Sequence, residues 1–357
     1  MRILIVDPYY PAVLADLYGR QPELAEASYD TQWRAIMALS FGTSDAYSYH
    51  LARLGHEAHE VVPNCRPLQL AWARDHAPHL TRLPWRFGAQ AIVLAQAKWL
   101  EPDVVYVQSI GAFRPAVLRR LRPRGGLLVG QISSALPQAE RVRPYDLLIT
   151  SFPHFVGRLG VPTEILRIGF DERVLERITD PPHHPVVFIG QLGGSSHRRA
   201  NAVVESAARR IPIDIWGPGA KEWPTDSPFR LRHHGTSWGL DMYRILSGAR
   251  IAVNRHNTAS AGHANNMRLF EATGVGTFLL TDQLEGLDEL FVPGRELVTY
   301  ADGDELVDKA SWYLDHSDER AEIAAAGQAR TLRDHGYGQR MSELVGILER
   351  SLRATSG

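Results

Sequence analysis

Asn265, Arg268 and Glu271 recur at every third position of the segment NNMRLFEATGVGTFLLTD (265–282). Residues three apart share one face of a helix, so a helix here would present these side chains together. A carboxylate accepts hydrogen bonds from both hydroxyls of a ribose, and an arginine near a helix N-terminus favours a phosphate. The stripe therefore indicates either a nucleotide-binding face or a solvated helix surface.

A glycine-rich turn, GQLGGSSHRRAN (190–201), leads from a predicted strand into a predicted helix. Glycines such as Gly190 let the backbone approach a phosphate closely, while His197 and Arg198 supply hydrogen-bond donors and charge. The turn matches neither the P-loop pattern nor the G-x-G-x-x-G fingerprint, which disfavours P-loop and NAD-binding functions. A flexible surface loop with solvated arginines fits these residues as well.

Two further glycines border predicted elements. Gly42 stands before Thr43, Ser44 and a predicted helix, where backbone N–H groups could receive an anion or an ordinary N-cap would suffice. Trp216 and Gly217 end a predicted strand, where a base could stack on the indole or bond to the backbone. A core tryptophan fits Trp216 equally.

Composition limits the classes of function. The chain has 357 residues, 44% of them hydrophobic and 22% charged, with a net charge of −1, as in a soluble globular protein of two domains. A nonspecific nucleic-acid binder would be more basic. The single cysteine, Cys65, excludes an intrachain disulfide and a multi-cysteine metal site. No segment has the 18 or more apolar residues of a membrane span, and MRILIVDPYYP fits a strand better than a signal peptide, so the expected location is the cytoplasm.

Short apolar runs alternate with amphipathic stretches along the whole chain. This alternation predicts an α/β protein with parallel sheets covered by helices, in which ligands bind beyond the carboxyl ends of the strands. The pattern starts again after a Pro- and His-rich stretch near 178–185, which predicts a second α/β unit. Predicted strands are 2–7, the end of 47–63, 101–109, 125–133, 145–151, 186–190, 211–217, 250–254 and 277–282. Predicted helices are the start of 47–63, 86–99, 114–121, 198–210, 240–247, the segment from 265, 303–315, 317–333 and 337–352.

The segments 265–282 and 289–341 together resemble the C-terminal half of bacterial group 1 glycosyltransferases of the CgeB-like, spore-maturation-protein type. The resemblance rests on the N-x-R-x-F-E-x-x-x-x-G core, the FVPGRE turn and the IAAAG…HGY…R tail. It implies the GT-B fold, with two Rossmann-like doubly wound domains facing each other across a cleft. The expected domains are 1–170 on the acceptor side, 171–336 on the donor side, and a helix at 337–357 that crosses back to the first.

The resemblance also implies roles for particular residues. Glu271 would hold the donor ribose, Arg198 with His197 would contact the diphosphate, and Gly42 would approach it from the other domain. Asn266 and Arg268 match polar positions of the family motif. No metal and no cofactor are expected, and the co-substrate is a nucleotide-diphosphate sugar, with UDP or GDP favoured.

The sequence departs from the family pattern at one position expected near the donor sugar. Retaining members often carry a second glutamate eight positions before the ribose glutamate, where this chain has His263. His263 is therefore the candidate beside the sugar. With retention the leaving phosphate itself can take the acceptor proton, whereas inversion needs a base on the N-terminal side. Candidates for that base are Asp7, Asp45, His50 and His154.

The sequence therefore predicts a metal-independent glycosyltransferase of the hexosyltransferase type, acting with retention on a small-molecule, glycan or protein acceptor. Two alternatives on the same fold are a nucleotide-sugar epimerase and a non-catalytic nucleotide-sugar binding protein. No nucleic-acid partner or transmembrane segment is expected, and no oligomeric state is predicted. The tyrosine-rich segment 7–42 suits stacking on a sugar, a hydrophobic acceptor, a helical lid or a dimer contact.

Overall fold

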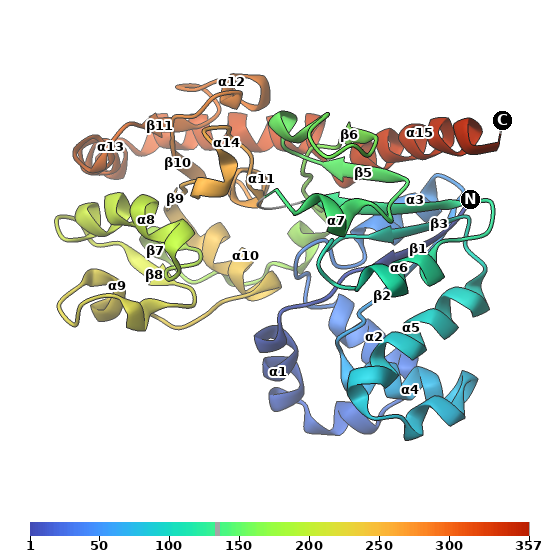
Figure 1. The fold of residues 1–357 in the computed structure, drawn as a ribbon. Helices are drawn as coiled ribbons and strands as arrows, with labels where there is room; N and C mark the ends of the chain where they lie inside the picture. The colour runs from blue at the N-terminus through green and yellow to red at the C-terminus, as the bar shows by residue number, and fades with distance from the viewer. Residues whose placement is uncertain (133–135, 357) are drawn as a thin grey trace. The chain divides into compact units, whose positions relative to one another are not determined.

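The computed structural model describes residues 1–132 and 136–356 and divides into two compact units (Figure 1). The N-terminal unit contains Met1–Arg167 together with Gly338–Gly357, and the C-terminal unit is Ile168–Tyr337. The sequence placed these borders after residues 170 and 336. Each unit has its own sheet and its own core.

The N-terminal unit contains a six-stranded parallel sheet with the order β2-β1-β3-β4-β5-β6. The central strands consist of branched and aliphatic residues buried on both faces, as parallel sheets covered by helices require. The strands are β1 (Arg2–Val6), β2 (Glu57–Val61), β3 (Val104–Val107), β4 (Leu127–Ile132), β5 (Leu147–Thr150) and β6 (Thr163–Ile165).

Eight helices of the described chain belong wholly or mainly to this unit. Proline occupies the first turn of α1, α4 and α6, where its missing N–H costs no helical hydrogen bond, and Ser28 caps α2. The helices are α1 (Pro11–Arg20), α2 (Tyr29–Met37), α3 (Ala46–Arg53), α4 (Arg66–His76), α5 (Trp85–Leu100), α6 (Pro115–Leu121), α7 (Ala139–Val142) and α15 (Tyr337–Ser356).

The C-terminal unit contains a five-stranded parallel sheet with the order β11-β10-β9-β7-β8. Its strands are β7 (His184–Ile189), β8 (Asp214–Trp216), β9 (Ala249–Val253), β10 (Phe278–Asp282) and β11 (Val298–Tyr300). Its helices are α8 (Ser195–Ala208), α9 (Pro228–Leu231), α10 (Gly239–Gly248), α11 (Met267–Gly274), α12 (Leu287–Leu290), α13 (Gly303–Asp315) and α14 (Ser317–Asp334).

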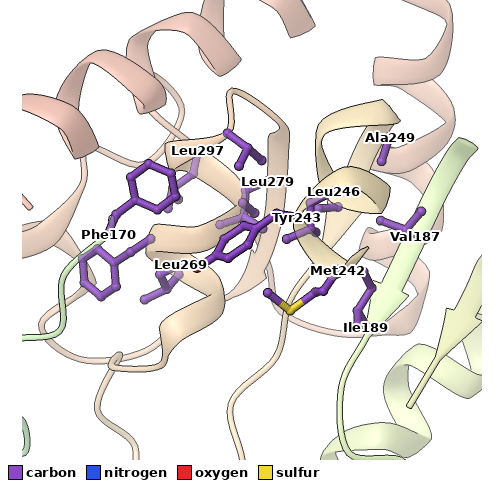
Figure 2. Packing of buried hydrophobic residues seen from close by; sticks show 14 of the residues in the cluster. Phe170, Val187, Ile189, Met242, Tyr243, Leu246, Ala249, Leu269, Leu279 and Leu297 are labelled. Atoms are coloured by element: carbon purple, nitrogen blue, oxygen red, sulfur yellow. The ribbon is translucent and has the colours of Figure 1, made fainter. Parts of the chain in front are cut away.

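One core of the C-terminal unit fixes α10 and α11 against the sheet. Figure 2 shows Met242 and Tyr243 of α10 beside Ile189 of β7 and Leu269 of α11. Leu269 is fully buried, and Tyr243 is 4% exposed. Because these side chains anchor the helices, the residues at the N-terminal end of α11 are held at the carboxyl end of β7.

In both sheets the direction in which successive strands are added reverses once. In the N-terminal unit the chain runs from β1 outward to β2 and then returns to place β3 on the other side of β1. In the C-terminal unit β8 and β9 lie on opposite sides of β7 in the same way. Ligands of open α/β sheets bind beyond the carboxyl ends of the strands at such switch points, here β1/β3 and β7/β9.

Each predicted strand corresponds to an observed one, although the last residue of predicted strand 125–133 lies outside the described residues. The edge strands β6 and β11 and the helices α1, α2, α4, α7, α9 and α12 were not predicted. The two doubly wound α/β units agree with the predicted fold class. Among the described residues, no helix has the length and apolarity needed to cross a bilayer.

Candidate functional site

The polar stripe of the opening segment is buried. Asn266 caps α11 by accepting a hydrogen bond from the backbone N–H of Leu269 at 3.3 Å. The neighbouring Asn265 and the carboxylate-bearing Glu271 are each only 8% exposed. The stripe is therefore not a solvated helix surface.

Arg268 and Glu271 form an ion pair one turn apart on α11, with 2.8 Å between Nη1 and Oε2. The second guanidinium nitrogen of Arg268 donates to the carbonyl oxygen of Ile189, the last residue of β7, at 3.3 Å. Burial raises the pKa of Glu271 above its usual value, although Arg268 opposes the change. A carboxylate and a cation are thus held together at the β7 end of the switch point.

Arg255, which follows β9 by two residues, is a second buried cation at this switch point. Its guanidinium donates to Asn201 Oδ1 at 2.7 Å and to the carbonyl oxygens of Gln191 at 3.0 Å and His256 at 3.4 Å. It forms no ion pair with any carboxylate of the described chain, and burial lowers its pKa to about 10. The residue is 8% exposed, and the groups that bond directly to its guanidinium are neutral, although the charge of Asp282 acts on it without forming an ion pair.

His197 lies in the first turn of α8 and completes this network. Arg255 Nη2 lies 3.1 Å from His197 Nδ1, and since a guanidinium can only donate, Nδ1 accepts and the ring proton is on Nε2. Burial and then the charge of Arg255 lower the pKa of His197. The turn 190–194 is thereby tied to α8 and to β9, and His197 offers an N–H donor at a helix N-terminus.

A second network joins the ends of β9 and β10. Asn254 and Asn266 exchange hydrogen bonds of 3.0 and 3.3 Å between their amides. The ring of His256 bonds to the carboxylate of Asp282 at 2.7 Å, and the backbone N–H of His256 donates to the same carboxylate. Burial opposes ionisation of Asp282, but these bonds prevail and lower its pKa. The network fixes the start of the loop that leads into α11.

The glycines at 190 and 217 bring two loops together. Gly217 has a φ of 138°, and a Cβ added there would lie 1.7 Å from the carbonyl oxygen of Gly190. Gly217 therefore permits the close approach of the loops after β7 and β8. Trp216 is 7% exposed, and His234 stacks on its ring at 4.7 Å. One face of this indole is thus covered by protein.

The other predicted donor-side residues are more exposed. Arg198 makes no side-chain hydrogen bond or ion pair with a residue that the structure describes, and its side chain is exposed. His263 lies in the loop before α11, where its Nδ1 is 3.7 Å from Glu285 Oε2. Arg198 is thus a charged side chain near the ordered network of Arg255.

In the N-terminal unit, Asp7 follows β1 directly. Its carboxyl group forms no hydrogen bond or ion pair within the described residues, and burial raises its pKa to about 7. Gln108 follows β3 at the same level of the sheet, and its backbone N–H donates to the carbonyl oxygen of Val6 at 3.0 Å. Both side chains lie at the β1/β3 switch point.

The loop before α3 reaches the same edge of this sheet. Thr43 donates from its hydroxyl to Gln108 Oε1 at 3.0 Å. Gly42 has a φ of 62°, and an added Cβ would meet no heavy atom within 4 Å. His154, the third predicted catalytic residue, lies in the short helix Pro153–Phe155, with its ring 4.4 Å from that of Phe155.

Sequence reasoning missed Arg255, His256, Asp282 and Gln108. The first two stand directly after the predicted strand 250–254, Asp282 is the last residue of predicted strand 277–282, and Gln108 directly follows the apolar run of predicted strand 101–109. A charged or amide residue at the end of an apolar run was the available signal. The burial of Arg255 was not readable, because it depends on contacts with residues 54 and 64 positions away.

A family model described as glycosyl transferase-like matches residues 198–346. No curated protein matches the chain. Among solved structures, a sucrose-phosphate synthase from Thermosynechococcus elongatus is 13% identical over 99% of both chains, with a TM-score of 0.60. A glycosyltransferase from Rickettsia africae is 10% identical over 98% of both chains, with a TM-score of 0.59. The Anabaena protein HepE, solved in complex with UDP and glucose, is 14% identical over 98% of this chain and 100% of its own, with a TM-score of 0.59.

These comparisons confirm the GT-B glycosyltransferase fold that the sequence predicted. The family match covers α11 and its flanking segments, which carried the resemblance. The family match supports the prediction of an enzyme of the glycosyltransferase class.

Proposed function

We propose that this chain is a CgeB-like glycosyltransferase that moves a sugar from a nucleoside-diphosphate sugar to an acceptor hydroxyl without a metal ion. The observation that carries the proposal is the buried guanidinium of Arg255 at the β7/β9 switch point, which has no carboxylate partner in the described chain. A buried cation without an ion-paired carboxylate is costly even with the charge of Asp282 farther away, and an anionic ligand at this position would offset that cost.

The diphosphate is assigned to the network around Arg255. His197 Nε2–H and the N-terminus of α8 are donors for phosphate oxygens, and the exposed Arg198 adds charge. As the bond between the anomeric carbon and the phosphate oxygen breaks, negative charge grows on the leaving diphosphate. Fixed donors and cations stabilise that charge in place of a metal ion.

The nucleoside is assigned to α11. Glu271 is buried and ion-paired to Arg268, and its carboxylate can accept both ribose hydroxyls. The favoured bases are uracil and guanine, and the UDP complex of the HepE structure supports uracil. A nucleotide-sugar donor and a single cysteine both fit the cytoplasm, where we place the reaction.

The sugar is transferred with retention in this proposal. The acceptor oxygen bonds to the anomeric carbon on the face that the phosphate leaves, and the acceptor proton passes to the departing phosphate oxygen. No protein base is then needed, and His263 would lie beside the sugar. Inversion would instead require a protein base, for which Asp7, Asp45, His50 and His154 are the candidates, and NMR of the product's anomeric configuration distinguishes the two outcomes.

The test is isothermal titration of UDP, GDP and dTDP in EDTA. We expect one diphosphate to bind wild-type protein and Arg255→Met to weaken it at least tenfold. Arg232→Met is the matched control, because Arg232 also donates to two carbonyl oxygens in this unit, at 2.9 and 2.7 Å, away from the switch point. Failure of all three diphosphates to bind, or unchanged binding in Arg255→Met, would reject the assignment.

Turnover separates the proposal from its two alternatives. The protein is incubated with an acceptor and with nucleotide sugars of the diphosphate that binds. A transferase would then release the free diphosphate and form a glycosylated acceptor. An epimerase would convert the nucleotide sugar without any acceptor, and a binding protein would leave it unchanged.

A further inference from the structure

A row of polar side chains lies near the carboxyl ends of three neighbouring strands of the N-terminal sheet. Val6 pairs with Val107 and Val107 with Gly130, so the next residues, Asp7 and Gln108, and then Gln131, lie side by side. Residues in register on parallel strands project from the same face of a sheet. The row therefore presents one carboxyl and two amides at the β1/β3 switch point and its neighbour.

Two members of this row have hydrogen-bonding capacity that the described chain does not use. Gln108 Nε2 is buried and has no partner among the described residues, although Thr43 holds its Oε1 at 3.0 Å. The carboxyl of Asp7 has no hydrogen-bond partner there either. Buried amides are rarely left unpaired because the loss of hydration is costly, so a missing partner points to a ligand.

The third member supports the other two from the same face. Gln131 Oε1 accepts a hydrogen bond of 2.8 Å from the hydroxyl of Tyr106, which lies two residues before Gln108 on β3. With Thr43 on one side and Tyr106 on the other, the amides are held by neighbouring hydroxyls. These two bonds fix the orientations of Gln108 and Gln131.

A donor beside an acceptor matches neighbouring hydroxyls, each of which both donates and accepts. Asp7 can accept from one hydroxyl while Gln108 donates to the next. An alcohol with one hydroxyl would leave one of the two groups unpaired. Tyr10, three residues after Asp7, is 59% exposed and lies edge-on to Phe41 at 5.3 Å, so an aromatic surface suited to a sugar ring lies nearby in the chain.

We propose that Asp7 and Gln108 bind two neighbouring hydroxyls of a neutral sugar or polyol, and that such a molecule is the acceptor of this chain. The role as acceptor rests on the proposed function, whereas the binding of a diol does not. Thr43 is a positioning residue, because it holds the Gln108 amide and does not itself reach the diol in this arrangement.

The test measures two affinities in each variant. The first is the Kd for myo-inositol, glycerol and methyl glucoside, which NMR titration measures. Cyclohexanol and a serine tripeptide are titrated as comparison ligands. The second is the Kd for UDP, GDP and dTDP by calorimetry. The variants are Gln108→Met, Thr43→Val and a control, Gln96→Met, since Gln96 on α5 is another buried amide of this unit without partners among the described residues.

We expect at least one polyol to bind wild type more tightly than cyclohexanol and the peptide. Gln108→Met should weaken it roughly tenfold, the loss expected for one unmade hydrogen bond, Thr43→Val should weaken it less, and Gln96→Met should leave it unchanged. Binding of no polyol, equal binding of cyclohexanol or the peptide, or an unaltered Kd in Gln108→Met would overturn the proposal. Failure of UDP, GDP and dTDP alike to bind wild type would overturn the proposed function alone, since the polyol titration would still test the row.

Discussion

Arg268 Nη1 lies 2.8 Å from Glu271 Oε2, and both side chains are largely buried at the end of β7. A pair of this kind behaves as a unit, because each partner cancels the cost of burying the other's charge. The three-residue spacing first suggested a ligand-binding face. The ion pair that this spacing allows, together with the bond from Arg268 to Ile189, also holds α11 in place.

Glu271→Ala should destabilise the C-terminal unit, because it leaves a buried guanidinium without its carboxylate. We expect a loss of about 3 kcal/mol in the free energy of unfolding, measured by urea unfolding. The double variant Arg268→Met, Glu271→Met should recover most of that loss, since it buries no charge. Equal stabilities of the single and double variants would argue against a buried pair.

The ring of His197 should be neutral at pH 7, with its proton on Nε2. Long-range nitrogen–proton NMR spectra report the tautomer, and a pH titration reports the pKa, which we expect below 6.5. In Arg255→Met the pKa should rise but stay below 6.5, because burial is the larger cause and remains. An Nδ1-protonated ring in wild type would mean that Arg255 does not donate to it.

Ionisation of Asp7 should lower the free energy of unfolding as the pH rises. Its pKa is 3.8 in the unfolded reference and about 7 in the fold, so between these values the folded state holds a proton that unfolding releases. The free energy of unfolding then falls by up to about 1.4 kcal/mol per pH unit in that window and levels off above pH 7.

Asp7→Asn isolates this contribution, because the other buried carboxyl groups, such as Glu60 on β2 and Glu271 on α11, are present in both proteins. The stability of wild type relative to the variant, from urea unfolding at pH 5 to 8, should decline with pH. A constant difference across this range would place the Asp7 pKa near its ordinary value.

Gly217→Ala should lower the thermal stability of the C-terminal unit by more than Gly294→Ala. At Gly217 the new Cβ would overlap the Gly190 carbonyl oxygen, so the two loops must separate. At Gly294 the φ is 81° but no heavy atom lies within 4 Å, so only backbone strain of roughly 1–2 kcal/mol arises. Calorimetric melting of both variants gives the comparison, and equal melting temperatures would show that the loops tolerate a side chain.

The long apolar strands were predictable because both faces of β1, β3 and β9 are buried. β6 was not, since its three residues are half-buried or exposed at an edge of the sheet and carry no apolar run. β11 is also three residues long, and its pairing with β10 is set by tertiary contacts. α1 and α2 fell in the tyrosine-rich segment, where a helical period was not recognised.

The site was predictable where local spacing determines geometry. Arg268 and Glu271 meet because they are three residues apart on one helix. Arg255 and Asn201 meet only because β9 and α8 converge in the folded unit, and no local pattern encodes that. The row of Asp7, Gln108 and Gln131 likewise follows from strand order, which a single sequence does not specify.

The two ends of the C-terminal unit are joined to each other. The backbone N–H of Phe170 donates to the carbonyl oxygen of His335 at 2.8 Å. The backbone N–H of Tyr337 donates to the carbonyl oxygen of Phe170 at 3.0 Å. The C-terminal unit is therefore an inserted domain: it interrupts the sequence of the N-terminal unit, and its own first and last residues lie side by side. Such an arrangement allows excision of residues 168–337 as an independent fragment, or circular permutation within it, without stretching any connection.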